Sequence, residues 1–87
     1  MYPFMTLEDD TEIVHSEILE NGEVKVYLET PDKKDGFHHM TVYLPSYRIE
    51  DEFGYSEERK EYFLNIIRTN ANLIIEFSKN GGFEHAK

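Results

Sequence analysis

Histidine, carboxylate and serine side chains are the groups in this sequence that could do chemistry. His38 and His39 are adjacent and suggest a metal-binding pair. Adjacent residues of a β-strand point to opposite faces, so these two imidazoles are not expected to bind one ion. His15 and His39 are expected on one face with Tyr27 between them, roughly 9–10 Å apart and too distant for a shared zinc ion. The histidines therefore predict no metal site.

The clustered carboxylates fall in two groups: Asp9, Asp10 and Glu12, and Glu50, Asp51 and Glu52. Neither group has the alternating ligands and central glycine of a calcium loop, so we interpret both as solvated acidic loops. No pair is marked out as a general acid and base, and the serines stand in no nucleophile motif. We predict no catalytic residue, no cofactor and no metal.

The composition excludes several classes of partner. The 87 residues include 18 acidic and 9 basic side chains, for a formal net charge of −9. This charge argues against nucleic acid and against anionic membranes, and it suits a basic protein partner. There is no cysteine, no signal-peptide pattern and no apolar run that could span a bilayer. We expect a single cytoplasmic domain over residues 1–87.

The longest helical signal runs over residues 56–79. Ser56 is a good N-cap, and Glu57 and Glu58 place negative charge where it complements the helix dipole. Lys79 and the following Asn-Gly-Gly of residues 80–82 form a helix stop. The apolar residues of this helix cover an arc of roughly 220°, which is more than one sheet face can cover.

The width of that arc predicts an interface. Its two edges carry the candidate contact residues: Leu64, Ala71 and Ile75 on one side, and Tyr62, Ile66 and Leu73 on the other. We expect one of these edges to form the contact of a homodimer.

A β-hairpin is predicted around Asn21-Gly22, between strands over residues 11–19 and 23–29. A three-residue loop with Gly22 in a bulge pairs Ile18 with Val24, Ser16 with Val26, and Val14 with Leu28 on the core side. A two-residue loop would turn Glu17 and His15 toward the core, so the apolar pattern favours the longer loop. In that register His15 lies opposite Tyr27 on the outer face.

The remaining segments complete an α+β fold. Residues 1–7 are a candidate for a short first strand, which Pro3 restricts to an edge or to a position at the first residue of the strand. Residues 30–36 are expected to form a mobile connection. The strand over residues 37–44 places Met40, Val42 and Leu44 on the core side together with His38. Residues 46–55 have no clear assignment, with a short helical turn as one option. We predict a three- to four-stranded antiparallel sheet (order ββββα) with the C-terminal helix on one face.

The other face of this sheet is expected to carry an aromatic patch. Its residues are His15, Tyr27, His39 and Tyr43, with Ile13 and Phe37 beside them. A contiguous patch of this kind marks an interaction or ligand surface. Three functions follow: a homo-oligomeric interaction module, an antitoxin-like regulator of a basic protein, and a small ligand-binding protein or enzyme that uses this face.

Several short runs resemble a family of small uncharacterised bacterial proteins. They are Tyr2-Pro3-Phe4, Glu12-Ile13-Val14-His15-Ser16, Asp35-Gly36-Phe37, Leu44-Pro45-Ser46-Tyr47, Asn70-Ala71 and Gly81-Gly82. The resemblance covers nearly the full length and implies a bacterial single-domain protein of unknown function. It implies no activity, cofactor or site residue.

Overall fold

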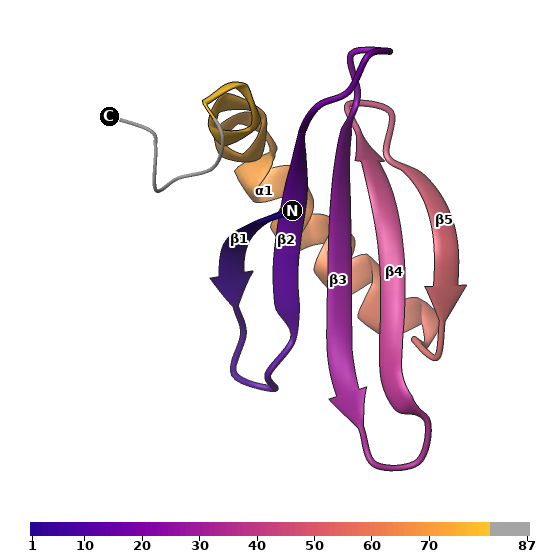
Figure 1. The fold of residues 1–87 in the computed structure, drawn as a ribbon. Helices are drawn as coiled ribbons and strands as arrows, with labels where there is room; N and C mark the ends of the chain where they lie inside the picture. Colours follow the sequence, from indigo (N-terminus) through magenta and orange to yellow (C-terminus); the bar gives the residue numbers. More distant parts are fainter. Residues whose placement is uncertain (81–87) are drawn as a thin grey trace.

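Five antiparallel strands and one helix make up the fold, shown in Figure 1 as a computed structural model that describes residues 1–80. The elements are β1 (Tyr2–Thr6), β2 (Glu12–Ile18), β3 (Val24–Asp32), β4 (Gly36–Leu44), β5 (Arg48–Phe53) and α1 (Glu57–Lys79). The strands lie in the sheet in their sequence order, β1-β2-β3-β4-β5. The predicted α+β class is confirmed, and the sheet has five strands where three to four were expected.

The helix α1 crosses one face of the sheet diagonally and leaves the other face open (Figure 1). Phe63, Ile67 and Ile74 are its buried apolar residues, and they join the buried residues of β2, β3 and β4 in one core. The Ser56 side chain accepts a hydrogen bond from the Arg59 N–H at 3.2 Å, so the predicted N-cap is confirmed. The predicted glycine stop and the C-terminal tail lie outside the described residues.

The β2–β3 hairpin has the predicted loop but not the predicted register. Ile18 pairs with Val24, and Gly22 has a φ of 86°, as expected for a three-residue loop. A bulge between His15 and Ile18 then shifts the register by one residue. The Lys25 N–H donates to the Ser16 hydroxyl at 2.9 Å, which satisfies a backbone group that the bulge would leave unpaired.

The shifted register changes which residues of β2 face the core. His15 pairs with Val26 and Ile13 with Leu28, and both His15 and Ile13 are buried. The predicted pairs Ser16–Val26 and Val14–Leu28 are therefore wrong. A slip of one residue exchanges the faces of a strand, so the bulge alone accounts for the difference.

The segment 30–36, expected to be a mobile connection, belongs to a long hairpin. β3 and β4 pair without interruption from Val24–Leu44 to Asp32–Gly36. The Asp32 carboxylate accepts hydrogen bonds from the N–H groups of Lys34 and Asp35, at 3.0 and 2.8 Å. These bonds close a tight turn, so the expected mobile connection is wrong.

The segment without a sequence assignment contains β5, so the helical turn considered there is wrong. β5 pairs with β4 through Val42–Ile49 and Tyr43–Arg48. Its sequence, Arg-Ile-Glu-Asp-Glu-Phe, is mostly charged and has low strand propensity. The strand therefore depends on the hydrogen bonds that β4 offers it.

Gly54 follows β5 and lies directly against the His38 ring. Its φ is 91°, and a Cβ atom added there would stand 2.1 Å from His38 Cδ2. Both the backbone conformation and the contact therefore require glycine.

We predict that Gly54→Ala costs about 2 kcal/mol or more of the free energy of unfolding, because it adds a steric clash to the strain of a positive φ. Gly36→Ala is the matched control, since Gly36 has a φ of 83° with no atom within 4 Å of an added Cβ. The control is expected to lose about 1 kcal/mol. Urea denaturation of both variants measures the difference, and equal losses would contradict the close packing of Gly54 on His38.

Candidate functional site

Three rings form a stack on the outer face, the sheet face away from α1. Tyr27 and His39 have ring centroids 6.3 Å apart at 25°, and His39 and Phe53 have centroids 5.7 Å apart at 28°. Three strands supply the rings, because His39 of β4 pairs with Phe53 of β5 and lies diagonally across from Tyr27 of β3. We call Tyr27, His39 and Phe53 the aromatic stack.

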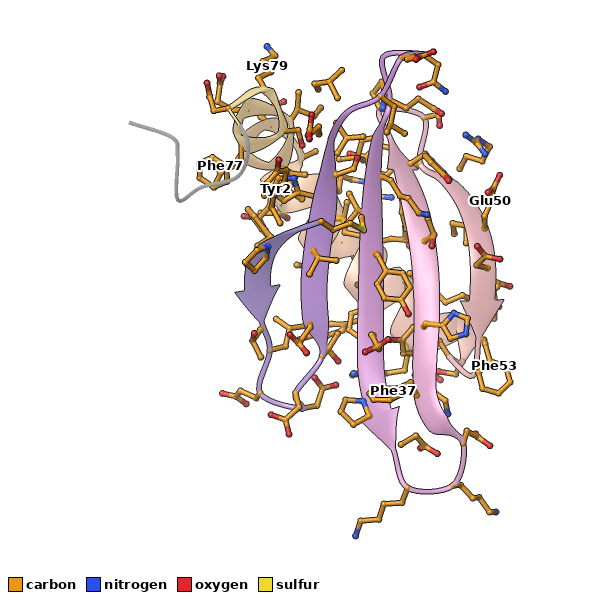
Figure 2. All side chains as sticks on the ribbon, viewed as in Figure 1. Tyr2, Phe37, Glu50, Phe53, Phe77 and Lys79 are labelled. Atoms are coloured by element: carbon orange, nitrogen blue, oxygen red, sulfur yellow. The ribbon has the colours of Figure 1, made fainter. Side chains whose placement is uncertain are left out.

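The apolar character continues at the end of the sheet where Phe37 and Phe53 lie (Figure 2). Phe37 is 49% exposed and Phe53 is 48% exposed. Thr41 also belongs to the outer face, yet it is only 2% exposed. The aromatic neighbours thus cover part of the sheet in place of a second layer, and they present large apolar rings to solvent.

A backbone carbonyl holds the His39 ring. Its Nδ1 lies 2.7 Å from the Asp51 carbonyl oxygen, so Nδ1–H is the donor. Asp51 has a φ of 53° at the irregularity where β5 shifts against β4. The local backbone conformation of β5 therefore orients the central ring of the aromatic stack.

Tyr27 contributes a hydroxyl that stays protonated. It donates to Glu29 at 2.8 Å. Burial, then this hydrogen bond and the charge of Glu29, raise the pKa of Tyr27 from 10.0 to about 12, with smaller contributions from Tyr55 and Asp51. At neutral pH the phenol can donate a hydrogen bond but cannot act as a general base.

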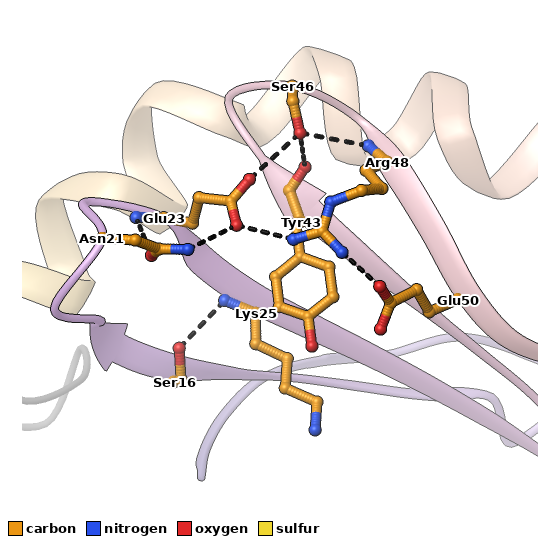
Figure 3. Close-up of polar contacts among 8 residues, drawn as sticks. All are labelled: Ser16, Asn21, Glu23, Lys25, Tyr43, Ser46, Arg48 and Glu50. Atoms are coloured by element: carbon orange, nitrogen blue, oxygen red, sulfur yellow. Dashed lines mark hydrogen bonds and ion pairs between the residues drawn. The ribbon is translucent and has the colours of Figure 1, made fainter.

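At the opposite end of the outer face, Arg48 contacts Tyr43, Glu23 and Glu50 (Figure 3). We call this group of polar contacts the clamp. The Arg48 guanidinium lies 4.2 Å from the centroid of the Tyr43 ring. It forms ion pairs with Glu23, at 2.7 Å, and with Glu50. Asn21 and Ser46 also donate to the Glu23 carboxylate. The clamp ties the β2–β3 loop to the start of β5.

The residues of the predicted patch do not all lie together. Tyr27, His39 and Tyr43 are on the outer face, and sequence reasoning missed Phe53 because its segment had no assignment. His15 is fully buried between the sheet and α1, so its expected place in the patch is wrong. The β2 bulge is the physical reason, because it turns His15 toward the helix.

His15 is bonded inside the core. Its Nδ1 lies 2.9 Å from the Ser16 carbonyl oxygen and 3.0 Å from the Ser78 hydroxyl. The rings of Tyr2 and Phe4 pack beside it. Its Nε2 is buried and has no hydrogen-bond partner among the described residues. The ring thus joins β2 to the last turn of α1.

The two predicted edges of the helix differ in exposure. Leu64, Ala71 and Ile75 are half-buried and pack against the core, as does Ile66. Tyr62 and Leu73 are 48% and 46% exposed. The apolar surface that α1 leaves uncovered therefore lies on the edge of Tyr62 and Leu73.

A group of side chains that could hold a metal lies at the β3–β4 turn. Asp32, Asp35 and His38 each offer a ligand atom, and these atoms lie within 4.8 Å of one another. Sequence reasoning missed the group because it treated residues 30–36 as a mobile connection. The Asp-x-x-Asp-x-x-His spacing across a tight hairpin would have been the signal.

Comparison of the chain with protein-family models, with curated proteins and with solved structures finds no significant match. The resemblance to a family of small bacterial proteins therefore stays a prediction. Among residues 1–80, no helix is both long and apolar enough to cross a membrane.

The clamp predicts a pH dependence of stability. Burial raises the pKa of Glu23, but hydrogen bonds from Arg48, Asn21 and Ser46 outweigh burial and bring it below its usual 4.5. A lowered folded-state pKa stabilises the fold fully above the unfolded-state value, and this contribution is lost as the pH falls through the folded-state value.

We expect Glu23→Gln to lower the stability at neutral pH and to flatten its decline between about pH 5 and about pH 3. Urea denaturation at several pH values measures both effects. Glu20→Gln, an exposed position in the same loop, is expected to follow the wild-type profile. A decline as steep in Glu23→Gln as in the wild type would contradict the clamp.

Proposed function

We propose that this protein is a small acidic, non-enzymatic interaction module whose outer face docks a basic segment of a partner protein. The aromatic stack, with exposed Phe37 at the same end of the sheet, is the observation that carries the proposal. An exposed aromatic surface of this kind is costly to leave in water, which favours a partner that covers it.

The charge of the molecule favours a basic partner. Ring faces attract guanidinium and ammonium groups, and the aliphatic stems of Arg and Lys cover apolar surface. Glu29 lies beside Tyr27, and Glu50 lies across from Thr41 in the neighbouring strand. The net charge of −9 would steer a basic segment toward the protein.

The same charge weighs against a second copy as the occupant of this face. Two outer faces placed together would bring identical carboxylates, including Glu12 and Glu29, close to one another. A basic segment has the opposite sign and avoids this repulsion.

The groups of the aromatic stack suit binding better than catalysis. Tyr27 remains protonated at neutral pH, so its phenol cannot serve as a general base. Ligand and active sites are normally concave and exclude water, whereas the outer face is an open sheet surface. The lack of cysteine supports a cytoplasmic location.

We predict that a short arginine-rich peptide perturbs the NMR signals of Tyr27, His39 and Phe53, and that its binding weakens with added salt. Phe53→Ala is expected to weaken the binding about fivefold or more, because it removes one exposed ring of the stack.

Leu73→Ala is the matched control, since Leu73 has nearly the same exposure as Phe53 but lies on α1. It is expected to bind the peptide like the wild type. Equal weakening in both variants, or equal binding of a glutamate-rich peptide of the same length, would sink the proposal.

Self-association is a second candidate, carried by a different surface. Tyr62 and Leu73 are exposed on the α1 edge nearer β1, and a cleft of about 530 Å³ separates Tyr62 from the β1–β2 turn. β1 is an open edge strand without charged side chains, whereas the other edge strand, β5, is mostly charged. Charged edges resist the approach of another sheet, and Pro3 and the bulge of β1 resist strand pairing, so a second copy on the β1 side would make contact through the side chains of Tyr62 and Leu73.

If the α1 edge with Tyr62 and Leu73 forms the contact of a homodimer, Leu73→Glu should shift the protein to monomers in sedimentation equilibrium, because the substitution buries a charge at the contact. Asn72→Glu adds the same charge at an exposed position on another side of α1 and should leave the dimer intact. A wild-type protein that stays monomeric at all concentrations would exclude this candidate.

A further inference from the structure

We propose that Asp32, Asp35 and His38 form a binding site for a divalent transition-metal ion, with Zn²⁺ as the best-fitting ion. This site does not depend on the proposed docking role.

The distances between the ligand atoms suit such an ion. His38 Nε2 lies 3.0 Å from Asp35 Oδ2 and 3.6 Å from Asp32 Oδ1. Zinc binds imidazole nitrogen and carboxylate oxygen at about 2.0–2.2 Å, which places neighbouring ligand atoms roughly 3 to 3.6 Å apart. A small rotation of the exposed Asp35 carboxylate would complete the arrangement around the half-buried Asp32.

The ligands come from one hairpin whose geometry is held before any ion binds. Asp32 uses Oδ2 to accept the N–H groups of Lys34 and Asp35, which leaves Oδ1 facing His38. The turn thus orients one ligand through backbone hydrogen bonds and brings a second, Asp35, within reach. Preorganised ligands lower the entropic cost of binding.

The His38 ring is held equally firmly. The rings of Phe53 and Tyr55 contact it edge-on, with centroids 6.0 and 5.9 Å away, and Gly54 packs directly against it. Nε2, the nitrogen left facing the carboxylates, is the atom a metal would take. A ring whose rotamer is fixed by packing loses little further freedom when it binds an ion.

The donor set selects the class of ion. Ca²⁺ and Mg²⁺ prefer oxygen ligands alone, whereas an imidazole with two carboxylates suits zinc and related transition metals. Three protein ligands leave at least one position for water or another molecule. His39 lies on the opposite face of the sheet and takes no part.

The competing explanation is an ion pair, in which a protonated His38 simply neutralises the two aspartates. That arrangement would need no metal and would show no saturable binding. Titration calorimetry with Zn²⁺, together with NMR signals, separates the two explanations.

We expect one Zn²⁺ per chain, with NMR changes confined to residues 30–38 and 53–55, and no comparable binding of Mg²⁺. Asp35→Asn, at an exposed turn position, and His38→Ala should each weaken binding about tenfold or more. Since His38→Ala removes a partly buried ring, Asp35→Asn tests the site without disturbing that packing.

His39→Ala and Asp51→Asn are the controls, a second histidine and a carboxylate from another acidic group. Both should bind Zn²⁺ like the wild type. Absence of saturable binding, or equal loss in the His39 control, would overturn the proposal in favour of the ion pair or of adventitious surface binding.

Discussion

One helix can cover only one face of a five-stranded sheet, and the surface of this molecule follows from that constraint. Phe63, Ile67 and Ile74 of α1 close the core on one side. On the other side the sheet is shielded by its own side chains, which is why Thr41 is almost inaccessible on an open face. The aromatic stack therefore shields part of the sheet and at the same time presents apolar rings to solvent.

The bulge in β2 shows how a local irregularity changes which side chains lie on each face of the sheet. It places His15 beside Ser78 in the core, where the imidazole joins the sheet to the end of α1. Because of this shift β2 contributes no ring to the aromatic stack, whose three rings come from β3, β4 and β5. A histidine that looked available for chemistry is thus a packing residue, and its buried Nε2 carries no hydrogen bond among the described residues.

The β3–β4 hairpin and the residues after β5 build the second surface of interest. Asp32 closes the turn, and the turn sets Asp35 opposite His38. Gly54 and its neighbours hold the imidazole from the other side. Phe53 contacts both His38 and His39, so one ring borders the metal-capable group and belongs to the aromatic stack.

Local interactions made part of this fold readable from the sequence. The helix with its Ser56 cap and the loop at Gly22 depend on residues a few positions apart, so periodicity and turn chemistry predicted them. The apolar alternation of Met40, Val42 and Leu44 likewise predicted the core face of β4.

Only the tertiary structure decided the β2 register, the formation of β5 and the grouping of Asp32, Asp35 and His38. The bulge is stabilised by the burial of Ile13 against Leu28 and by the hydrogen bond from the Lys25 N–H to the Ser16 hydroxyl, and both are contacts between strands. β5 has little strand propensity of its own and takes its hydrogen bonds from β4. The hydrogen bonds of a strand come from a partner strand elsewhere in the chain. The sequence therefore determines which residues can pair, and tertiary packing determines which of these residues come into contact.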